Sequence, residues 1–255
     1  TANGNVFLRH AASILDDYEK MLHLSTDQEQ TQLSVCCNQV PFCSDAFLHQ
    51  ITAWQNAESM TFKMLRGNYS FCLNKLQRFK CQFAILGFLD GAQHSYLDIC
   101  TSAGMNCKKI GSAAAALLLR RKHPLLQNMH ASSADALLKL PGLYQYPYIN
   151  YSLDEYQDDI LTPFQIGSDF WPVNPNKIIT VNSFEQKLNI LRSTNGFSFG
   201  VSTADQIVES SDGICLIPHC DVRFSYYCIF PAKESLSPVA QAFLEEMQKQ
   251  LQPEI

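Results

Sequence analysis

Residues 177–202 read KIITVNSFEQKLNILRSTNGFSFGVS, and they predict a complete strand–helix–strand unit. KIITV is a short β-branched run of the kind that forms strands. Ser183 stands at a favourable helix N-cap, and SFEQKLNILRS carries apolar side chains at helical spacing. The run FSFGVS then predicts a second, short strand. A strand joined by a helix to another strand is the building unit of α/β folds.

The same alternation continues on both sides of this unit. Strands are predicted at 33–37, 60–65, 81–88, 146–150, 177–181, 197–202 and 222–230, and helices at 47–54, 70–79, 135–140, 152–164, 183–193 and 237–251. The apolar run 110–121 is a further buried segment, whose centre at 113–119 fits either a strand or a short helix. This order predicts an α/β fold with mixed, mostly parallel sheets. A chain of 255 residues fits two compact lobes better than one long sheet.

Composition narrows the class of protein. Hydrophobic residues make up 46% of the chain and charged residues 17%, as in ordinary globular proteins. No apolar run reaches the roughly 18–20 residues that a membrane-spanning helix needs. Most of the ten cysteines lie inside apolar runs, which predicts buried thiols in a reduced, cytoplasmic protein. The net charge of -5 argues against this chain gripping nucleic acid by itself.

The N-terminal segment predicts an amphipathic helix. Its apolar residues recur at alternating spacings of four and three, which is the a/d pattern of a helix that pairs with another helix: Phe7, Ala11, Ile14, Tyr18 and Met21. A helix lying on its own domain is the alternative. The polar segment STDQEQTQ follows directly and separates the helix from the rest of the chain. We therefore favour a dimerisation helix.

Motifs of catalysis are absent from the sequence, which contains no nucleophile elbow, phosphate-binding loop, zinc-protease motif or dinucleotide fingerprint. CLIPHC places Cys215, His219 and Cys220 close together, but a zinc site normally needs a fourth ligand. We therefore expect no enzyme activity, no cofactor and no metal.

Several segments, taken in order, resemble one known family. They are TANGNVFLRHAASILDDYEKML, LSVCC, FAILGFLD, LLLRRKHPLL, VNSFEQKLNILRSTNGFSFGVST and SLSPVAQAFLEEMQKQL. This series resembles the linker helix and effector-binding domain of LysR-type transcriptional regulators, and it covers nearly the whole chain. The resemblance implies a two-lobed α/β fold like that of type II periplasmic binding proteins. It also implies a linker helix and polar linker at 1–31, a first lobe at 32–116 plus 234–255, and a second lobe at 117–233, with crossovers near Ala116 and Phe230.

The resemblance further implies a regulatory function. A small-molecule effector would bind between the lobes and change the geometry of a homodimer or homotetramer. A winged helix-turn-helix domain, expected to precede Thr1, would then contact promoter DNA differently. No membrane partner is expected.

Three strand-to-helix turns are expected to line the ligand site, since ligands bind at the carboxyl ends of strands in such sheets. The expected site residues are Asn38, Gln39, Val40, Gly87, Phe88, Tyr148, Asn150, Ser152, Asn182, Ser183, Phe199 and Gly200. Helix capping alone would equally explain Ser152 and Ser183. Phe88 and Tyr148 are expected at the cleft edge, because each sits at a strand end. The turns carry no Lys or Arg, which favours a small, partly aromatic or weakly charged effector.

Two other functions remain open. A solute-binding protein of a transporter would share the fold, but the ten cysteines and the lack of a secretion signal disfavour it. A thiol-based redox regulator of the peroxide-sensing branch would need a reactive cysteine in or beside 150–165, and that stretch has none.

Overall fold

The computed structural model describes residues 31–38, 42–91, 93–127, 141–151, 177–204, 208–211 and 213–251, the last without the side chains of 219–221, together with Ala11, Ile14 and Tyr18. Two predicted helices, at 135–140 and 152–164, lie outside the described residues. The remaining predicted strands and helices are confirmed to within a few residues, apart from the last predicted strand, which is longer.

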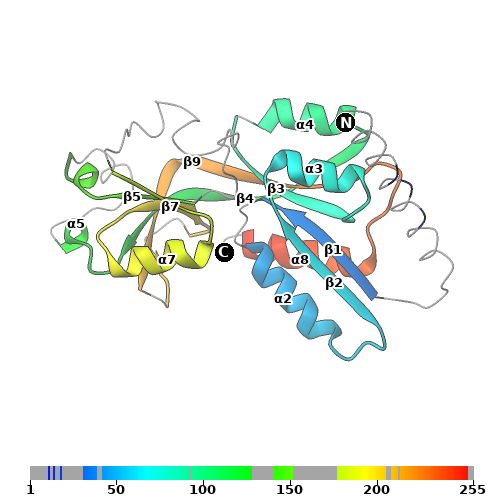
Figure 1. Ribbon diagram of the computed structural model, residues 1–255, viewed down its shortest axis with the longest axis horizontal. Helices are drawn as coiled ribbons and strands as arrows, with labels where there is room; N and C mark the ends of the chain where they lie inside the picture. Colours follow the sequence, from blue (N-terminus) through cyan, green and yellow to red (C-terminus); the bar gives the residue numbers. More distant parts are fainter. Residues whose placement is uncertain are drawn as a thin grey trace.

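A large mixed sheet forms the centre of the fold (Figure 1). Its strands are β1 (Thr31–Cys37), β2 (Met60–Arg66), β3 (Phe83–Leu89), β4 (Met105–Arg120), β7 (Ser198–Ser202), β8 (Val208–Glu209) and β9 (Ile214–Pro231). The order is β2-β1-β3-β9-β4-β7, and β8 also pairs with β9. β5 (Tyr148–Tyr151) and β6 (Ile178–Val181) form a separate parallel pair. The pairs β1–β2 and β1–β3 are parallel, whereas β4 and β9 pair antiparallel with their neighbours, so the sheet is more mixed than the sequence analysis predicted.

The helices are α2 (Phe42–Trp54), α3 (Tyr69–Gln77), α4 (Gln93–Ser102), α5 (Pro124–Gln127), α7 (Phe184–Ser193) and α8 (Pro238–Leu251), with a 3-10 turn, η1, at Pro141–Gln145. The helix α4 was not predicted from the sequence. Cys100 is the one buried residue of α4, so the sequence of this helix lacks the apolar stripe that would have indicated it.

Two long strands, β4 and β9, run through both halves of the molecule (Figure 1). The first half contains β1–β3, α2–α4 and α8, and the second half contains β5–β7, α5 and α7. Residues 113–119 of β4 are all buried, which settles the choice between strand and helix. A central strand covered on both faces is apolar throughout and lacks the usual alternation.

Each half has its own apolar core. In the first half, α2 and α8 pack on one face of the sheet and α3 and α4 on the other, with Phe83 and Phe243 rings 5.5 Å apart. In the second half, apolar residues of β5, β7 and α7 pack around β4. Along β4 the change occurs between Ala113, in the first core, and Ala115, in the second. Phe224 of β9 contacts both cores, so β4 and β9 pass from the first core to the second near Ala113–Ala115 and Phe224.

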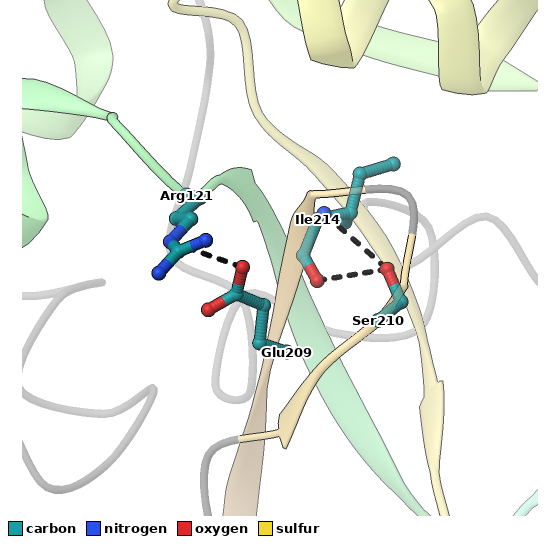
Figure 2. Close-up of polar contacts among 4 residues, drawn as sticks. All are labelled: Arg121, Glu209, Ser210 and Ile214. Atoms are coloured by element: carbon teal, nitrogen blue, oxygen red, sulfur yellow. Dashed lines mark hydrogen bonds and ion pairs between the residues drawn. The ribbon is translucent and has the colours of Figure 1, made fainter.

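Polar contacts hold the turn before β9 in place (Figure 2). The Ser210 hydroxyl accepts from the Ile214 amide at 3.3 Å and donates to the Ile214 carbonyl at 3.0 Å. Arg121 lies beside Glu209, with Nε and Oε1 3.1 Å apart. Both side chains are exposed, so this ion pair contributes about 1 kcal/mol or less.

The cysteines are buried as the sequence predicts. The nine described cysteines are free thiols, and eight of them are buried. Across the described residues, no helix is long and apolar enough to span a membrane. Of the predicted dimerisation helix, Ala11, Ile14 and Tyr18 are helical, whereas Phe7 and Met21 lie outside the described residues. Ile14 is 69% exposed and Tyr18 57% exposed, so neither is buried against its own domain.

His123 joins β4 to the second core. It is fully buried, its Nε2 lies 2.8 Å from the Asn195 carbonyl, and its Nδ1 lies 3.2 Å from the Leu125 amide. A neutral ring with its proton on Nε2 satisfies both contacts. The imidazole also packs edge-on against Tyr146. Burial lowers the pKa of His123 below its ordinary value of 6.5.

We expect His123→Ala to lower the free energy of unfolding by about 2 kcal/mol at pH 7, because two buried hydrogen bonds are lost. Above pH 6.5 the ring is neutral in both folded and unfolded chains. Below it the unfolded chain binds a proton first, so the wild type loses stability as the pH falls. Urea denaturation at pH 7 and pH 5.5 should show a smaller loss in the variant. An equal loss in both proteins would contradict this role.

Candidate functional site

Polar side chains from the two halves meet where the parallel strands end. β2 ends at Arg66 in the first half, and β5 ends at Tyr151 in the second. The Arg66 guanidinium donates to the Ser44 hydroxyl in the first turn of α2. It also hydrogen-bonds with the Tyr151 side chain and lies beside the Cys37 thiol. Arg66 therefore connects the halves at the edge where α/β sheets bind ligands.

The contacts continue from Tyr151 into α7. The Tyr151 and Phe184 rings lie 6.1 Å apart in an edge-on arrangement. Phe184 opens α7, and the Lys187 ammonium lies 5.8 Å from its ring centroid. Burial raises the pKa of the Tyr151 hydroxyl, and the Arg66 charge opposes that shift. A continuous set of side chains thus runs from Arg66 to Lys187.

Lys187 is a buried cation. It is 6% exposed, and its ammonium donates to the Phe199 carbonyl of β7 at 2.6 Å. Burial lowers the pKa of Lys187 to about 8, so most molecules carry its charge at pH 7. An ammonium has three N–H donors, and this hydrogen bond uses one of them. The side chain therefore has donors left for an anion.

The N-terminus of α7 adds to the positive potential. Ser183 is the N-cap, as predicted, and its hydroxyl accepts from the Gln186 amide at 3.4 Å. The preceding Asn182 is exposed. Backbone N–H groups at a helix N-terminus carry a partial positive charge that favours anions. The Ser183 turn thus combines a helix N-terminus with the nearby Lys187 charge.

Asn38 lies where the sequence placed it, and its side chain holds the backbone. Its Nδ2 donates to the Gly87 carbonyl at 3.2 Å, and its Oδ1 accepts from the Gly87 amide at 2.9 Å. These contacts extend the β1–β3 pairing beyond the end of β1. Gly87 is required for close approach, since a Cβ there would lie 2.6 Å from the Tyr226 ring. Tyr69 also donates to the Gly87 carbonyl.

We expect Asn38→Ala to lower the free energy of unfolding by about 2 kcal/mol, because it leaves the two Gly87 backbone groups without these partners. Asn189→Ala is the matched control. Asn189 accepts a surface hydrogen bond from Arg192, and its loss should change stability by less than about 0.5 kcal/mol. Urea denaturation of the two variants compares them directly. If the Asn38→Ala and Asn189→Ala variants were equally stable, the proposed structural role of Asn38 would be wrong.

Comparison with solved structures identifies the fold. No protein-family model matches the sequence, and no curated protein matches it. The full-length regulator CbnR, in complex with its target DNA, aligns over 98% of this chain and 81% of its own length, with 15% identity and a TM-score of 0.62. HinK, a LysR family transcriptional regulator from Pseudomonas aeruginosa, aligns over 99% of this chain and 81% of its own, with 16% identity and a TM-score of 0.56.

An effector-binding domain gives the same result. That of QuiR, in complex with shikimate, aligns over 88% of this chain and 98% of its own length, with 12% identity and a TM-score of 0.54. The fold is that of a LysR-type effector-binding domain. The comparison confirms the two-lobed, periplasmic-binding-protein-like α/β fold expected from the sequence.

Two aromatic residues occupy different places in this LysR-type fold than expected. Phe88 is fully buried and stacks on Tyr69 at 5.0 Å, and Tyr148 is buried 5.6 Å from both Phe197 and Phe199. The expectation that Phe88 and Tyr148 lie at a cleft edge is therefore wrong. Aromatic rings from α3 and from β7 cover these strand ends, which sequence position alone does not reveal.

The remaining predicted site residues divide into three groups. Asn182 and Ser183 are at least partly accessible at the start of α7. Asn150, Phe199 and Gly200 lie close to the second core, where Asn150 accepts from the Tyr148 hydroxyl and a Cβ on Gly200 would meet Leu118 at 2.7 Å. Gln39, Val40 and Ser152 lie outside the described residues.

Arg66 and Lys187 were not predicted as site residues from the sequence. Arg66 directly follows the apolar part of β2, so the rule that ligands bind at carboxyl ends of strands could have found it. Lys187 gave no signal, because a Lys in an amphipathic helix is normally exposed. Within the described ranges no group of side chains is arranged to hold a metal. Cys215 is buried in β9, and the side chains of His219 and Cys220 are not described.

Proposed function

We propose that this chain is the ligand-sensing regulatory region of a LysR-type transcription regulator. One observation carries the proposal, namely the contact between Arg66 of the first half and Tyr151 of the second at the carboxyl ends of parallel strands. A ligand placed there touches both halves at once. The shikimate complex of the QuiR domain supports a binding role for this fold. The neighbouring structures are regulators, which agrees with a protein that is not an enzyme.

We propose a small carboxylate as the ligand. Arg66, the α7 N-terminus and Lys187 supply a bidentate cation, backbone donors and a buried ammonium. Asn182 and Ser183 lie at the same helix end. The rings of Tyr151 and Phe184 would pack against the apolar part of the molecule. This revises the weakly charged effector expected from the three turns alone.

Ligand binding acts, in this proposal, by a shift between two arrangements of the halves. The strands β4 and β9 are the connections, and we place the boundary near Ala113–Ala115 and Phe224, where the cores change. On β9 this boundary, at Phe224, lies earlier in the chain than the predicted crossover at Phe230. A carboxylate that bridges Arg66 and α7 would favour the closed arrangement, and a bias of about 1–3 kcal/mol is typical of such coupling.

The regulatory output would pass through a homodimer or homotetramer. The exposed side chains of Ile14 and Tyr18 support the proposed dimerisation helix, because apolar residues at a/d positions are normally covered by a partner helix. Promoter DNA would be contacted by a DNA-binding domain outside these 255 residues. The complex of CbnR with its target DNA shows that a protein with this fold contacts DNA.

A thermal-shift comparison tests the proposal. The chain is heated alone and with a panel of small carboxylates that includes benzoate and shikimate, with the matching amides or alcohols as uncharged controls. A carboxylate at about 100 times its Kd adds about 2.7 kcal/mol, which is a shift of several degrees. We expect at least one carboxylate to raise Tm and its uncharged analogue to have no effect. Equal effects of the charged and uncharged members would contradict an anionic ligand.

A further inference from the structure

Three thiols from three separate segments meet in the first half. Cys36 lies on β1, Cys72 on α3, and Cys81 just before β3. The Sγ atoms of Cys36 and Cys72 are 3.0 Å apart, and Cys36 also hydrogen-bonds with Cys81. Cys36 and Cys72 are fully buried, and Cys81, at 5% exposed, is the member nearest to solvent. The cluster is distant in sequence and in role from the ligand contacts made by α7.

The three thiols differ in acidity because of their mutual hydrogen bonds. Contacts with Cys72 and Cys81 lower the pKa of Cys36, and the Lys75 charge acts in the same direction. The contact with Cys36 raises the pKa of Cys72 well above its ordinary value. Cys36 is therefore the thiol of the pair that loses its proton more readily, and Cys72 is the thiol that keeps its proton. Once Cys36 ionises, a thiolate lies next to a protonated thiol, which is the pairing that disulfide formation uses.

We propose that Cys36 and Cys72 are a redox site that closes to a disulfide when the protein meets a peroxide. The two sulfur atoms need to approach by about 1 Å to reach the length of a disulfide bond. Both lie on ordered elements, so the bond would tie α3 to β1. This inference stands on the thiol geometry and does not rest on the proposed ligand.

The chemistry balances with one hydrogen peroxide for each disulfide. The Cys36 thiolate attacks one peroxide oxygen, the O–O bond breaks, and Cys36 sulfenic acid forms with hydroxide, which takes up the proton that Cys36 released. The Cys72 sulfur then attacks the Cys36 sulfur, and the S–O bond breaks. The leaving hydroxide takes the Cys72 proton as water. Two thiols are oxidised, and one peroxide is reduced to two waters.

Oxidation of the cluster would change the position of Arg66 through the adjacent Gly67. The Cys72 thiol donates to the Gly67 carbonyl at 3.7 Å, and Gly67 also donates its amide to the Cys37 carbonyl at 3.1 Å. Gly67 directly follows Arg66 in the turn between β2 and α3. A disulfide has no proton to donate, so the contact with Gly67 would be lost. The position of Arg66 would then depend on the redox state of the cluster.

Peptide mapping of the full chain tests the site. Trypsin releases Cys72 alone in residues 67–75, Cys36 with Cys37 and Cys43 in 21–63, and Cys81 with Cys100 and Cys107 in 81–108. Reduced protein is treated with one equivalent of hydrogen peroxide, unfolded, alkylated and digested. We expect the 67–75 peptide cross-linked to the 21–63 peptide, two hydrogens lighter than the sum, in more than half of the molecules. Dithiothreitol should restore both peptides.

Two variants assign the partner within 21–63. Cys36→Ser should abolish the cross-link, whereas the adjacent Cys37→Ser, which keeps Cys36, should retain it. Full alkylation of Cys72 after peroxide would overturn the proposal. A cross-link from 67–75 to 81–108 would also overturn it, since Cys81 would then be the partner. The wild-type map gives this answer even if a variant fails to fold.

Discussion

Replacement of Lys187 by Met is expected to raise the free energy of unfolding by about 2 kcal/mol at pH 7. Burial holds the pKa of Lys187 at about 8, against 10.5 for an ordinary lysine. A pKa difference of that size means that the buried charge lowers the free energy of unfolding by about 3 kcal/mol. The lost hydrogen bond to the Phe199 carbonyl offsets about 1 kcal/mol of the gain. Met fills a similar volume without a charge.

The pH dependence gives the same prediction an independent readout. Below pH 8 both folded and unfolded chains carry the Lys187 proton, so the full penalty is present. Between pH 8 and 10.5 the folded chain has lost the proton while the unfolded chain keeps it, so this group makes stability rise with pH. The Met variant lacks that rise. Urea denaturation at pH 7 and pH 9 should therefore show the two proteins converging. A variant less stable than the wild type at pH 7 would contradict a penalised cation.

A cation that lowers stability next to a helix N-terminus is typical of a site that receives an anion. A bound carboxylate would raise the pKa of Lys187 back towards its ordinary value, because an opposite charge favours the protonated form. The stabilising effect of Lys187→Met should therefore shrink when a carboxylate is present. This links the stability result to the proposed function.

Replacement of Arg66 by Gln is expected to weaken carboxylate binding by about 10- to 100-fold. One hydrogen bond to a charged group contributes about 1.5–3 kcal/mol, which gives that range. Arg66 is itself exposed, so the free energy of unfolding should change little. Calorimetric titration with the carboxylate that stabilises the wild type most measures the change in Kd.

Arg121→Gln is the matched control for Arg66→Gln. It makes the same substitution at an exposed arginine, which directly follows β4 and pairs with Glu209 of β8. Its Kd should equal that of the wild type within about twofold. Parallel weakening in both variants would mean that overall charge, and not the position of Arg66, determines affinity. That result would remove Arg66 from the site.

Apolar patterning predicted most elements of the fold because burial decided them. The run at 81–88 is apolar almost throughout, the run at 183–193 carries apolar residues at helical spacing, and they form the expected elements, β3 and α7. α4 was missed because it buries Cys100 alone. β9 is longer than the predicted 222–230, because its first part contains Pro218, a residue that is uncommon inside a central strand. The local apolar pattern does not predict that one strand, β9, runs through both halves.

The site was predicted less well, because its residues come together only in three dimensions. Ser183 has a local signal, its N-cap position, and was placed correctly. Asn38 was located correctly, but its amide pairs with Gly87, which lies far away in the sequence. Arg66 contacts Tyr151 across the two halves, and no spacing in the sequence encodes that contact.

We propose that a small anion binds between the two halves. The most direct measurement is an amide NMR titration of the chain with the carboxylate that raises Tm most. We expect the largest shifts in both halves at once, at Arg66, at Tyr151 and at 183–187. Shifts confined to one half, or saturating shifts that avoid Arg66 and the α7 N-terminus, would contradict it.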